Sequence, residues 1–389
     1  LGVTPPMIYC DHAAATPLDD RVLAAMQPYF AEQSFNPSSP YAPAVAVRQA
    51  YRQAKHRLAV ALGGKPDEII MTAGATESIN LMFAGVHGHV VTANIEHHAV
   101  LAAAHQHDVT VVKANPKGVV TPEAIAQVIR PETVLVSIAL ANNELGTIQP
   151  LRAIAAVVAR ERQRRLEAGE STPLYLHSDA SQGAGQLDIN VARLGVDALT
   201  LNAGKIYGPK QVGLLWLARQ VRLDPLIVGG GQERGLRSGT ENVAGVVGFA
   251  AALECAQAHR KSEAQRLERL RNSMQQTLCK HIPAAVVSGD VKHRLAGHLH
   301  ISFPGVDAER LIFLLERDGV LVATGSACAA NKGLRSHVLT AIGLPPEVAD
   351  GSLRISLGRL STEENCQRAA QCIIAAVQHE QERMKGARR

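Results

Sequence analysis

Short apolar runs alternate with longer segments of helical pattern through the first two thirds of the chain. This alternation is typical of a mainly parallel sheet wrapped by helices, because each parallel strand needs a crossover connection to reach the next. We therefore predict seven strands, at residues 68–71, 89–93, 110–113, 133–139, 174–177, 198–201 and 213–217.

Five of these strands are followed directly by polar or small residues. In sheets of this kind, ligands bind beyond the carboxyl ends of the strands. Five such clusters are more than packing alone requires, so we expect them to form one ligand site. The clusters lie at residues 73–76, 94–98, 142–144, 179–182 and 202–205.

The pattern changes after Glu254 to a charged amphipathic helix, predicted at 256–278, followed by segments typical of a smaller α+β unit. We expect a large domain at 15–260. Residues 1–14 and 261–389 would form a small domain that carries the segment around Cys328. The charged run from Arg160 to Arg165 is interpreted as a solvated helix face.

Composition narrows the class of protein. The chain has 389 residues and a net charge of +5, and its basic residues are interspersed rather than gathered in the stripe that nucleic-acid binding requires. The longest apolar stretch, 243–253, is too short to span a bilayer. No C-x-x-C pair occurs among the six cysteines, which favours a reducing compartment, and we predict a cytoplasmic protein without direct nucleic-acid or membrane contacts. Because residue 1 is Leu, we expect the natural start to be missing or altered, which leaves an upstream targeting segment open.

Two residues at strand ends indicate a particular cofactor chemistry. Lys205 lies at the turn between two predicted strands, and Asp179 lies just past another. A surface lysine beside a Gly-Pro turn would be the simpler interpretation of Lys205 alone. A buried aspartate, however, needs a cationic partner. A lysine Schiff base with an acid at the ring nitrogen is how proteins hold pyridoxal phosphate.

Two further clusters fit the same site. Residues 74–78 open a helix after a strand, so their backbone N–H groups and the Thr76 hydroxyl can bind an anion, although an ordinary helix cap has the same pattern. His97 follows a strand and is our candidate for stacking on a cofactor ring, whereas His98 is expected to be structural. We predict no metal site, because no second set of ligands has suitable spacing.

Cys328 is the candidate nucleophile. It lies among small residues and is followed by a polar, loop-like stretch, as a mobile thiol requires. Free cysteines are usually small buried apolar residues. We expect that role for Cys255, Cys279, Cys366 and Cys372.

Together these motifs resemble those of the cysteine desulfurases, which belong to the fold type I, class V aminotransferase superfamily. The resemblance covers essentially the whole chain. It is carried by residues 8–17, 74–78, 96–97, 142–146, 177–182, 205–210, 233–240, 325–328 and 353–358. It implies an α/β fold with a mainly parallel sheet in the large domain, a smaller α+β domain, and pyridoxal phosphate as cofactor.

The resemblance also implies individual roles. Lys205 would bind the cofactor covalently, Asp179 would keep its ring nitrogen protonated, and His97 would stack on the ring. The other cofactor contacts would come from Ala75, Thr76, Asn143, Gln182 and Asn202, and from Thr240 of a neighbouring subunit in a homodimer. Arg354 and Asn143 would bind the substrate, L-cysteine. The catalytic residues would be Lys205, Cys328 and His97, and the Cys328 persulfide would pass to an acceptor protein for iron–sulfur clusters, thio-cofactors or tRNA thiolation.

One departure affects the phosphate site. The family usually has a serine and a histidine at the positions of Asn202 and Gly204, and Gly204 has no side chain to bind phosphate. Two other interpretations stay open. The chain could be another class V enzyme, such as a selenocysteine lyase or a transaminase, or a catalytically silent assembly subunit.

Overall fold

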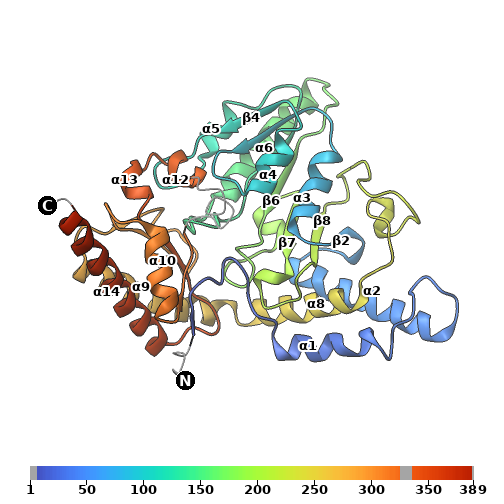
Figure 1. Ribbon diagram of the computed structural model, residues 1–389. Helices are drawn as coiled ribbons and strands as arrows, with labels where there is room; N and C mark the ends of the chain where they lie inside the picture. Colours follow the sequence, from blue (N-terminus) through green and yellow to red (C-terminus); the bar gives the residue numbers. More distant parts are fainter. Residues whose placement is uncertain (1–6, 325–334, 388–389) are drawn as a thin grey trace.

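A seven-stranded sheet with helices on both faces forms the larger part of the molecule (Figure 1). The computed structural model describes residues 7–324 and 335–387. In spatial order the strands are β2 (Ile69–Thr72), β8 (Gly213–Leu217), β7 (Ala198–Asn202), β6 (Tyr175–Asp179), β5 (Thr133–Ser137), β3 (His89–Ala93) and β4 (Val109–Val112). All seven predicted strands are present, and their bounds shift by two residues at most.

The sheet is mixed. Strand β8 runs antiparallel to both of its neighbours, β2 and β7, whereas the remaining pairs are parallel. The predicted α/β fold with a mainly parallel sheet is confirmed. The carboxyl ends of β3, β5, β6 and β7 therefore meet at one edge, where the polar clusters follow them.

Helices bury both faces of this sheet, and successive strand residues alternate between them. Ile69 and Met71 of β2 belong to one apolar cluster with residues of α2 (Ala42–Leu62), α6 (Leu151–Glu167) and α8 (Val243–Ala258). Ile70, between them, belongs to a second cluster with residues of α3 (Ala75–Ala84) and α4 (His98–Ala104). Burial on both faces explains why the strands appear as continuous apolar runs.

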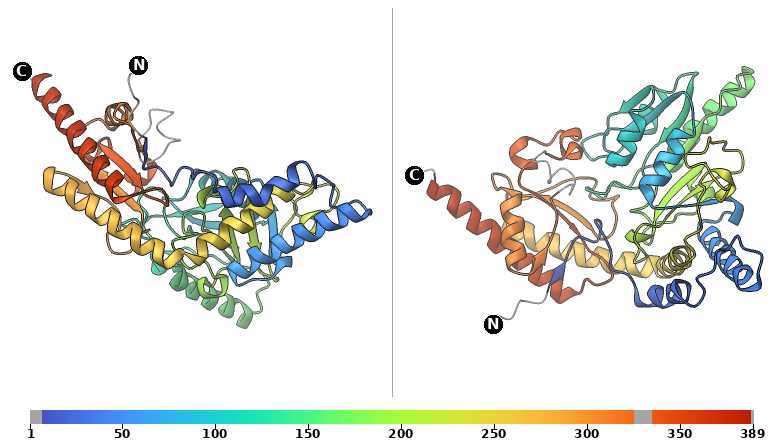
Figure 2. Two further views of the ribbon diagram at one scale, coloured as in Figure 1. Left: turned by 90° about the horizontal axis from the view of Figure 1, so that it is seen from below. Right: turned by 45° about the vertical axis from the view of Figure 1, so that its right-hand side comes forward.

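A smaller unit stands beside the large sheet (Figure 2). Its antiparallel sheet has the order β12 (Ser352–Ser356), β10 (His298–Ser302) and β9 (Val286–Val287), and β1 (Ile8–Tyr9) pairs in parallel with β11 (Val320–Leu321). Helices α9 (Arg260–His281), α10 (Ala308–Arg317) and α14 (Glu363–Ala387) pack on it and share an apolar cluster with its strands. Residues near the start of the chain thus lie with its last third.

Shorter helices complete the fold: α1 (Asp20–Met26), α5 (Pro122–Ala126), α7 (Val191–Leu194), α12 (His337–Ala341) and α13 (Pro346–Ala349), with 3-10 turns η1 (Gln27–Phe30), η2 (Pro66–Glu68), η3 (Ala203–Lys205) and η4 (Glu233–Gly235). The helix predicted at 256–278 is interrupted, since α8 ends and α9 begins on either side of His259. None of the helices in the described part of the chain could cross a membrane.

The charged run on α6 differs from the prediction. Arg165 is buried, and its guanidinium donates to the backbone carbonyls of Arg130, Thr133 and Thr172. Arg164, by contrast, is exposed and pairs with Glu161 and Glu170. The solvated-face interpretation is therefore wrong for Arg165. The backbone carbonyls at the start of β5 and in the adjoining loops need a hydrogen-bond donor where they are buried, and Arg165 supplies it.

Candidate active site

A cavity of about 330 Å³ opens at the carboxyl ends of the parallel strands. Ligand pockets commonly lie at this edge and start at about this size. Nine of the predicted site residues line it: Ala75, Thr76, His97, Asn143, Asp179, Gln182, Asn202, Lys205 and Arg354. The structure thus brings together residues from four strand ends, one helix start and the smaller unit.

Lys205 is the last residue of the turn η3, which follows β7. Its Nζ donates to the carbonyl oxygens of Ala13 at 2.9 Å and Ala14 at 2.6 Å, and Gln182 Nε2 also donates to Ala13 O, at 3.0 Å. Burial, followed by the nearby charge of Arg354, lowers the pKa of the Lys205 amine. A larger fraction of the amine is therefore unprotonated and nucleophilic than in an ordinary lysine.

Asp179 ends strand β6 and lines the cavity. Its Oδ1 accepts from the backbone N–H of Ser181 at 2.9 Å, which fixes the carboxylate at the strand end. The N-terminus of α3 lies at the same cavity, with Gly74 as its N-cap at a φ of 140°. A Cβ at Gly74 would meet nothing within 4 Å, so the left-handed backbone rather than crowding requires glycine here.

His97 is the N-cap of α4, and its Nδ1 accepts from the backbone N–H of Ala99 at 3.1 Å. Burial lowers the pKa of the His97 imidazole. The ring is therefore expected to be neutral, with its proton on Nε2, because Nδ1 acts as the acceptor. His98, interpreted as structural, lies against the ring of His337 with 4.4 Å between ring centroids.

Arg354 enters the cavity from β12 of the smaller unit. Its Nη2 donates to Asp11 Oδ1 at 2.7 Å, and its Nη1 donates to the carbonyl of Asn143 at 3.3 Å. Arg354 Nε is buried and lacks a hydrogen-bond partner among the residues that the structure describes. The guanidinium is thus held in place while part of its donor capacity stays available to an anion.

These residues fit a phosphorylated pyridine cofactor with an aldehyde group. A buried amine with a lowered pKa, a carboxylate, a helix N-terminus with a hydroxyl, and a neutral imidazole all face one cavity. The amine suits an aldehyde carbon, the carboxylate suits a pyridinium nitrogen, and the helix N-terminus suits a phosphate.

Two predicted residues do not lie in this cavity. Thr240 is exposed on the loop that precedes α8. Cys328 lies outside the residues that the structure describes. Of the four other cysteines expected to be buried, Cys366 is buried, whereas Cys255, Cys279 and Cys372 are only partly buried. The sulfur of Cys255 also contacts an arginine.

Sequence reasoning missed three contributions to the site. The backbone carbonyls of Ala13 and Ala14 carry no sequence signal, because any residue supplies a carbonyl. Asp11 belongs to a recognised motif, but only the fold brings it to Arg354. Glu144 is buried at the cavity, and its carboxylate accepts from the Ser336 hydroxyl at 2.6 Å. Its position in the polar cluster 142–144 was the sequence feature that could have identified it as a site residue.

Comparisons with known proteins place the chain in a family. The aminotransferase class-V family model matches residues 8–369. A protein named cysteine desulfurase IscS from Dictyoglomus turgidum is 39% identical over 370 residues, which cover 92% of this chain and 91% of that protein.

Solved structures agree. A NifS-like protein superposes with a TM-score of 0.87 at 34% identity, and the match covers 96% of this chain and 100% of the other. A structure described as SspA in complex with cysteine superposes with a TM-score of 0.76 at 35% identity, and it covers 90% of this chain and 98% of the other.

The resemblance predicted from the motifs is therefore confirmed, and with it the predicted cofactor. The family match extends from β1 into α14, so it includes both the large sheet and the smaller unit. This chain belongs to the aminotransferase class-V family, whose members depend on pyridoxal phosphate.

Proposed function

We propose that this protein is a cysteine desulfurase that takes sulfur from L-cysteine, releases L-alanine, and holds the sulfur as a persulfide on Cys328. One observation carries the proposal: Lys205, Asp179 and Arg354 line a single cavity at the carboxyl ends of the parallel strands. The relatives named as cysteine desulfurases and the related structure described with cysteine support this substrate.

Lys205, Asp179 and His97 would hold the cofactor ring, with Asn143 and Gln182 beside it. Ala75, Thr76 and Asn202 would bind its phosphate. The cofactor, once bound, supplies an electron sink for the pair of electrons left when the substrate loses its α-proton. The carboxylate of Asp179 would keep the ring nitrogen protonated and thereby strengthen that sink.

Lys205 Nζ would accept the α-proton of the substrate and later return a proton to it. Its lowered pKa favours the unprotonated form that a base requires. Neutral His97, with a proton on Nε2, would exchange protons beside the ring. Arg354 would bind the substrate carboxylate, and its contact with Asp11 would hold the guanidinium in a fixed orientation.

Cys328 would attack the substrate sulfur as a thiolate. The new S–S bond would form as the carbon–sulfur bond breaks, leaving the sulfur on Cys328 and the carbon skeleton as alanine. An acceptor protein, such as an iron–sulfur scaffold or a sulfur carrier, would then take the sulfur. A plain transaminase has no such step, because amino transfer leaves the carbon–sulfur bond intact and needs no thiol.

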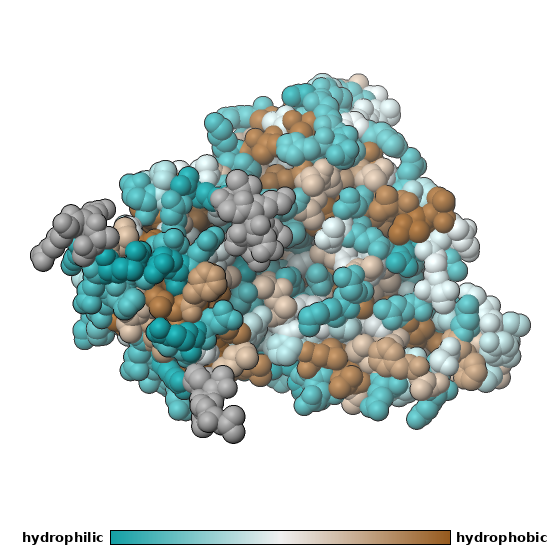
Figure 3. Space-filling view, viewed as in Figure 1, coloured by the Kyte–Doolittle hydropathy of each residue, from teal (hydrophilic) through white to brown (hydrophobic). Residues whose placement is uncertain are grey.

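The protein is also proposed to work as a homodimer. Thr240 is exposed, and so are three apolar residues of the same loop region: Leu226, Ile227 and Val228. An apolar patch is visible over this loop in Figure 3. In the dimer, Thr240 would reach the phosphate site of the partner subunit.

The test uses the holoenzyme and L-cysteine. We expect alanine and sulfide in equal amounts with a reductant, and one extra sulfur on the Cys328 peptide without it. Lys205→Ala should abolish both the cofactor linkage and turnover, because it removes the amine. Lys210→Ala, five residues further on, is the matched control and should retain the linkage.

Three outcomes would overturn the proposal. The covalent cofactor could map to Lys210, the extra sulfur could map to another cysteine, or the holoenzyme could release no alanine from L-cysteine. The last result, in a protein that binds the cofactor normally, would favour a different class V reaction.

A further inference from the structure

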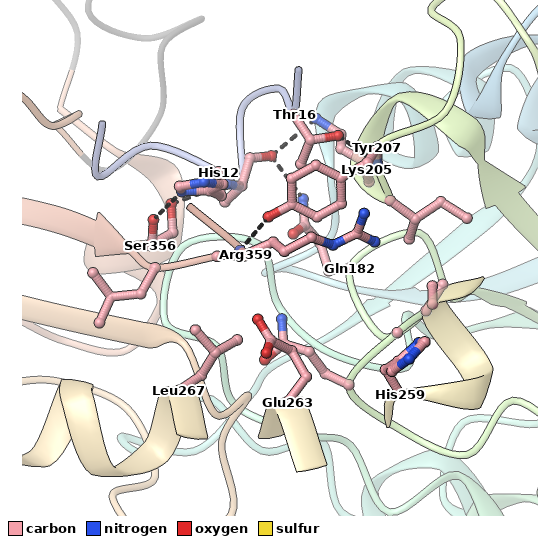
Figure 4. A pocket seen from close by; sticks show the side chains of 18 of the residues that line it. His12, Thr16, Gln182, Lys205, Tyr207, His259, Glu263, Leu267, Ser356 and Arg359 are labelled. Carbon is pink, nitrogen blue, oxygen red and sulfur yellow. Dashed lines mark hydrogen bonds between the residues drawn. The ribbon is translucent and has the colours of Figure 1, made fainter. Parts of the chain in front are cut away.

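A second cavity, of about 250 Å³, is also lined by Lys205 and is not used by the proposed reaction (Figure 4). Lys205 and Gln182 line both cavities. The wall of the second cavity also includes residues of the loop after β1, of α1, of the segment after β6, of the end of α8 and the start of α9, and of the segment after β12. Small-molecule sites often occupy such positions between two units of a fold.

The half-buried thiol of Cys255 lines this cavity from the last turn of α8, and it also lines a neighbouring cavity of about 210 Å³. Three basic groups surround its sulfur. Arg21 Nη2 is 3.1 Å from Sγ, Arg359 Nη2 is 3.9 Å away, and His259 Nδ1 is 3.9 Å away. His259 Nδ1 also lies 2.9 Å from the Cys255 carbonyl oxygen, so the two arginines are the charged neighbours of the sulfur. Arginines in this position stabilise a thiolate, which is the reactive form of cysteine.

The other described cysteines have a different environment. Burial raises the pKa of the Cys10 thiol to about 12 and that of Cys366 to about 11. It also raises the pKa of the Cys279 and Cys372 thiols. Burial disfavours the thiolate at all four. Cys255 differs from these four in having two arginine guanidinium groups within 4 Å of its sulfur.

Asp19 fixes the two arginines beside the sulfur. Arg21 donates to Asp19 through Nε at 3.0 Å and through Nη2 at 2.8 Å, and Nη2 is the atom that contacts Sγ. Arg359 pairs with the same carboxylate, and its guanidinium lies 4.2 Å from the ring centroid of Tyr207. Two cations share one carboxylate, so one positive charge is left over. It faces the Cys255 thiolate first and, once that sulfur has formed a disulfide, becomes available to a carboxylate on the bound half.

The other acidic groups nearby are engaged elsewhere. Glu254, next to Cys255 in the chain, pairs with Arg57. Glu263, which lines the cavity, pairs with Arg266. Neither carboxylate is therefore left to repel an anion that approaches the two arginines.

We propose that Cys255 is a modification site for small disulfides that carry a carboxylate group. The Cys255 thiol loses its proton to solvent, and the thiolate sulfur bonds to one sulfur of the disulfide. The disulfide bond breaks, and the other half leaves as a thiolate that takes up a proton. Cys255 is oxidised and the leaving half is reduced, so the disulfide is the only oxidant required.

The carboxylate of the bound half would face Arg21 and Arg359, and its carbon atoms would occupy the cavity. L-cystine is one such disulfide, and its relevance rests on the proposed function, because it forms from the proposed substrate. The reactivity of Cys255 itself does not rest on that function, since the thiol and both arginines lie outside the cavity assigned to the reaction.

The test compares three disulfides on the holoenzyme: L-cystine, dithiodiglycolate with two carboxylates, and cystamine with two ammonium groups. Peptide mapping by mass spectrometry follows the mixed disulfide at each cysteine over time. We expect Cys255 to react several-fold faster with dithiodiglycolate than with cystamine, and several-fold faster than Cys279 or Cys372. Equal rates at these three cysteines, or a preference for cystamine at Cys255, would overturn the proposal.

Arg21→Gln is the informative variant, because the Arg21 side chain is largely exposed and its loss leaves the Asp19–Arg359 pair in place. The preference of Cys255 for the anionic disulfide should fall several-fold at an unchanged unfolding temperature. If this variant failed to fold, Arg359→Gln would provide the same comparison. An unchanged preference in a folded variant would contradict the role of the arginines.

Failure of this inference and failure of the proposed function are distinguishable. Cys255→Ser should still release alanine and sulfide from L-cysteine, while its peptide carries no mixed disulfide. A holoenzyme without desulfurase activity but with a modified Cys255 would overturn the function alone. An active enzyme with an unreactive Cys255 would overturn this inference alone.

Discussion

Asn202 and Gly204 act as a pair at the turn that presents Lys205. The side-chain oxygen of Asn202 accepts from the backbone N–H of Gly204 at 3.0 Å and caps η3. A Cβ on residue 204 would lie 3.3 Å from that same oxygen, which is tighter than an ordinary contact. The glycine therefore accommodates the Asn202 cap, and the two departures from the family pattern have a common structural reason.

We predict that Asn202→Ala weakens both the fold and cofactor binding. Loss of the cap should cost about 1 kcal/mol of unfolding free energy. Loss of one hydrogen bond to a charged phosphate, worth about 1.5 kcal/mol, should lower cofactor affinity by about tenfold. Denaturant unfolding of the cofactor-free protein and titration with pyridoxal phosphate measure the two effects.

Asn190→Ala is the matched control, because Asn190 caps α7 with a bond of 3.1 Å to the N–H of Arg193 and lies outside the cavity. It should show the stability loss without the loss of affinity. Equal cofactor affinity in the two variants would contradict a phosphate contact from Asn202.

Single residues were the hardest part of the site to predict. The sequence indicated Lys205 and Asp179 because each follows an apolar strand run. It gave no indication that Asp11 pairs with Arg354, since 343 positions separate them along the chain. Cys255 was expected to be a small buried apolar residue, and only the folded arrangement of α1, α8 and the segment after β12 places two arginines beside it.

At the scale of elements, a buried glutamate joins the ends of two strands. Glu96 follows β3, and its carboxylate accepts from the backbone N–H of Ala139, after β5, at 3.0 Å. Burial raises the pKa of the Glu96 carboxyl to about 8, although that hydrogen bond opposes the shift. The folded protein thus holds a proton on Glu96 at pH values where the unfolded chain has released it.

We predict that this proton makes stability fall with rising pH. Between the ordinary value of 4.5 and about 8, the native state binds more protons at Glu96 than the unfolded state does, so raising the pH favours unfolding. Glu96→Gln removes this titration and keeps an oxygen to accept from Ala139. The stability of the variant relative to the unaltered protein should therefore increase across that window.

Denaturant unfolding of the unaltered protein and of Glu96→Gln, both free of cofactor and at several pH values, measures this change in relative stability. Glu161→Gln is a suitable control, because contact with Arg164 lowers the pKa of Glu161 to about 2 and its titration lies below the window. A constant stability difference between the unaltered protein and Glu96→Gln would refute the prediction.

The elements themselves could be predicted well from sequence because their physical signal is strong. Strands buried on both faces leave continuous apolar runs, and the run at residues 213–217 matches β8 at both ends. Strand direction leaves no such signal, so the antiparallel orientation of β8 appeared only in the structure. The break at His259 was missed for a similar reason, since no proline or glycine marks it.

At the scale of the whole molecule, an exposed apolar loop and an exposed threonine occur together. Val228 is 78% exposed, and Thr240 follows on the same connection between β8 and α8. Exposed apolar residues that cluster, rather than occur singly, mark interaction sites. In the proposed homodimer this loop would meet the partner subunit, so assembly and cofactor retention would depend on the same contact.

We predict that Val228→Asp weakens both dimer assembly and cofactor retention. A carboxylate buried in an apolar interface without a cationic partner costs several kcal/mol, which shifts the equilibrium toward monomers. The monomer should lose cofactor faster, because Thr240 of the partner subunit no longer reaches the phosphate. Sedimentation velocity over a range of concentrations, followed by the cofactor absorbance, measures both effects. Phe313→Asp is the control, since Phe313 is 70% exposed on α10 of the smaller unit, away from this loop. The Phe313→Asp variant should sediment as the unaltered protein does.

Two outcomes would contradict this interface. If Val228→Asp remained dimeric, or if only Phe313→Asp dissociated, the dimer interface would lie elsewhere, and Thr240 could not be assigned to the phosphate site of the partner subunit.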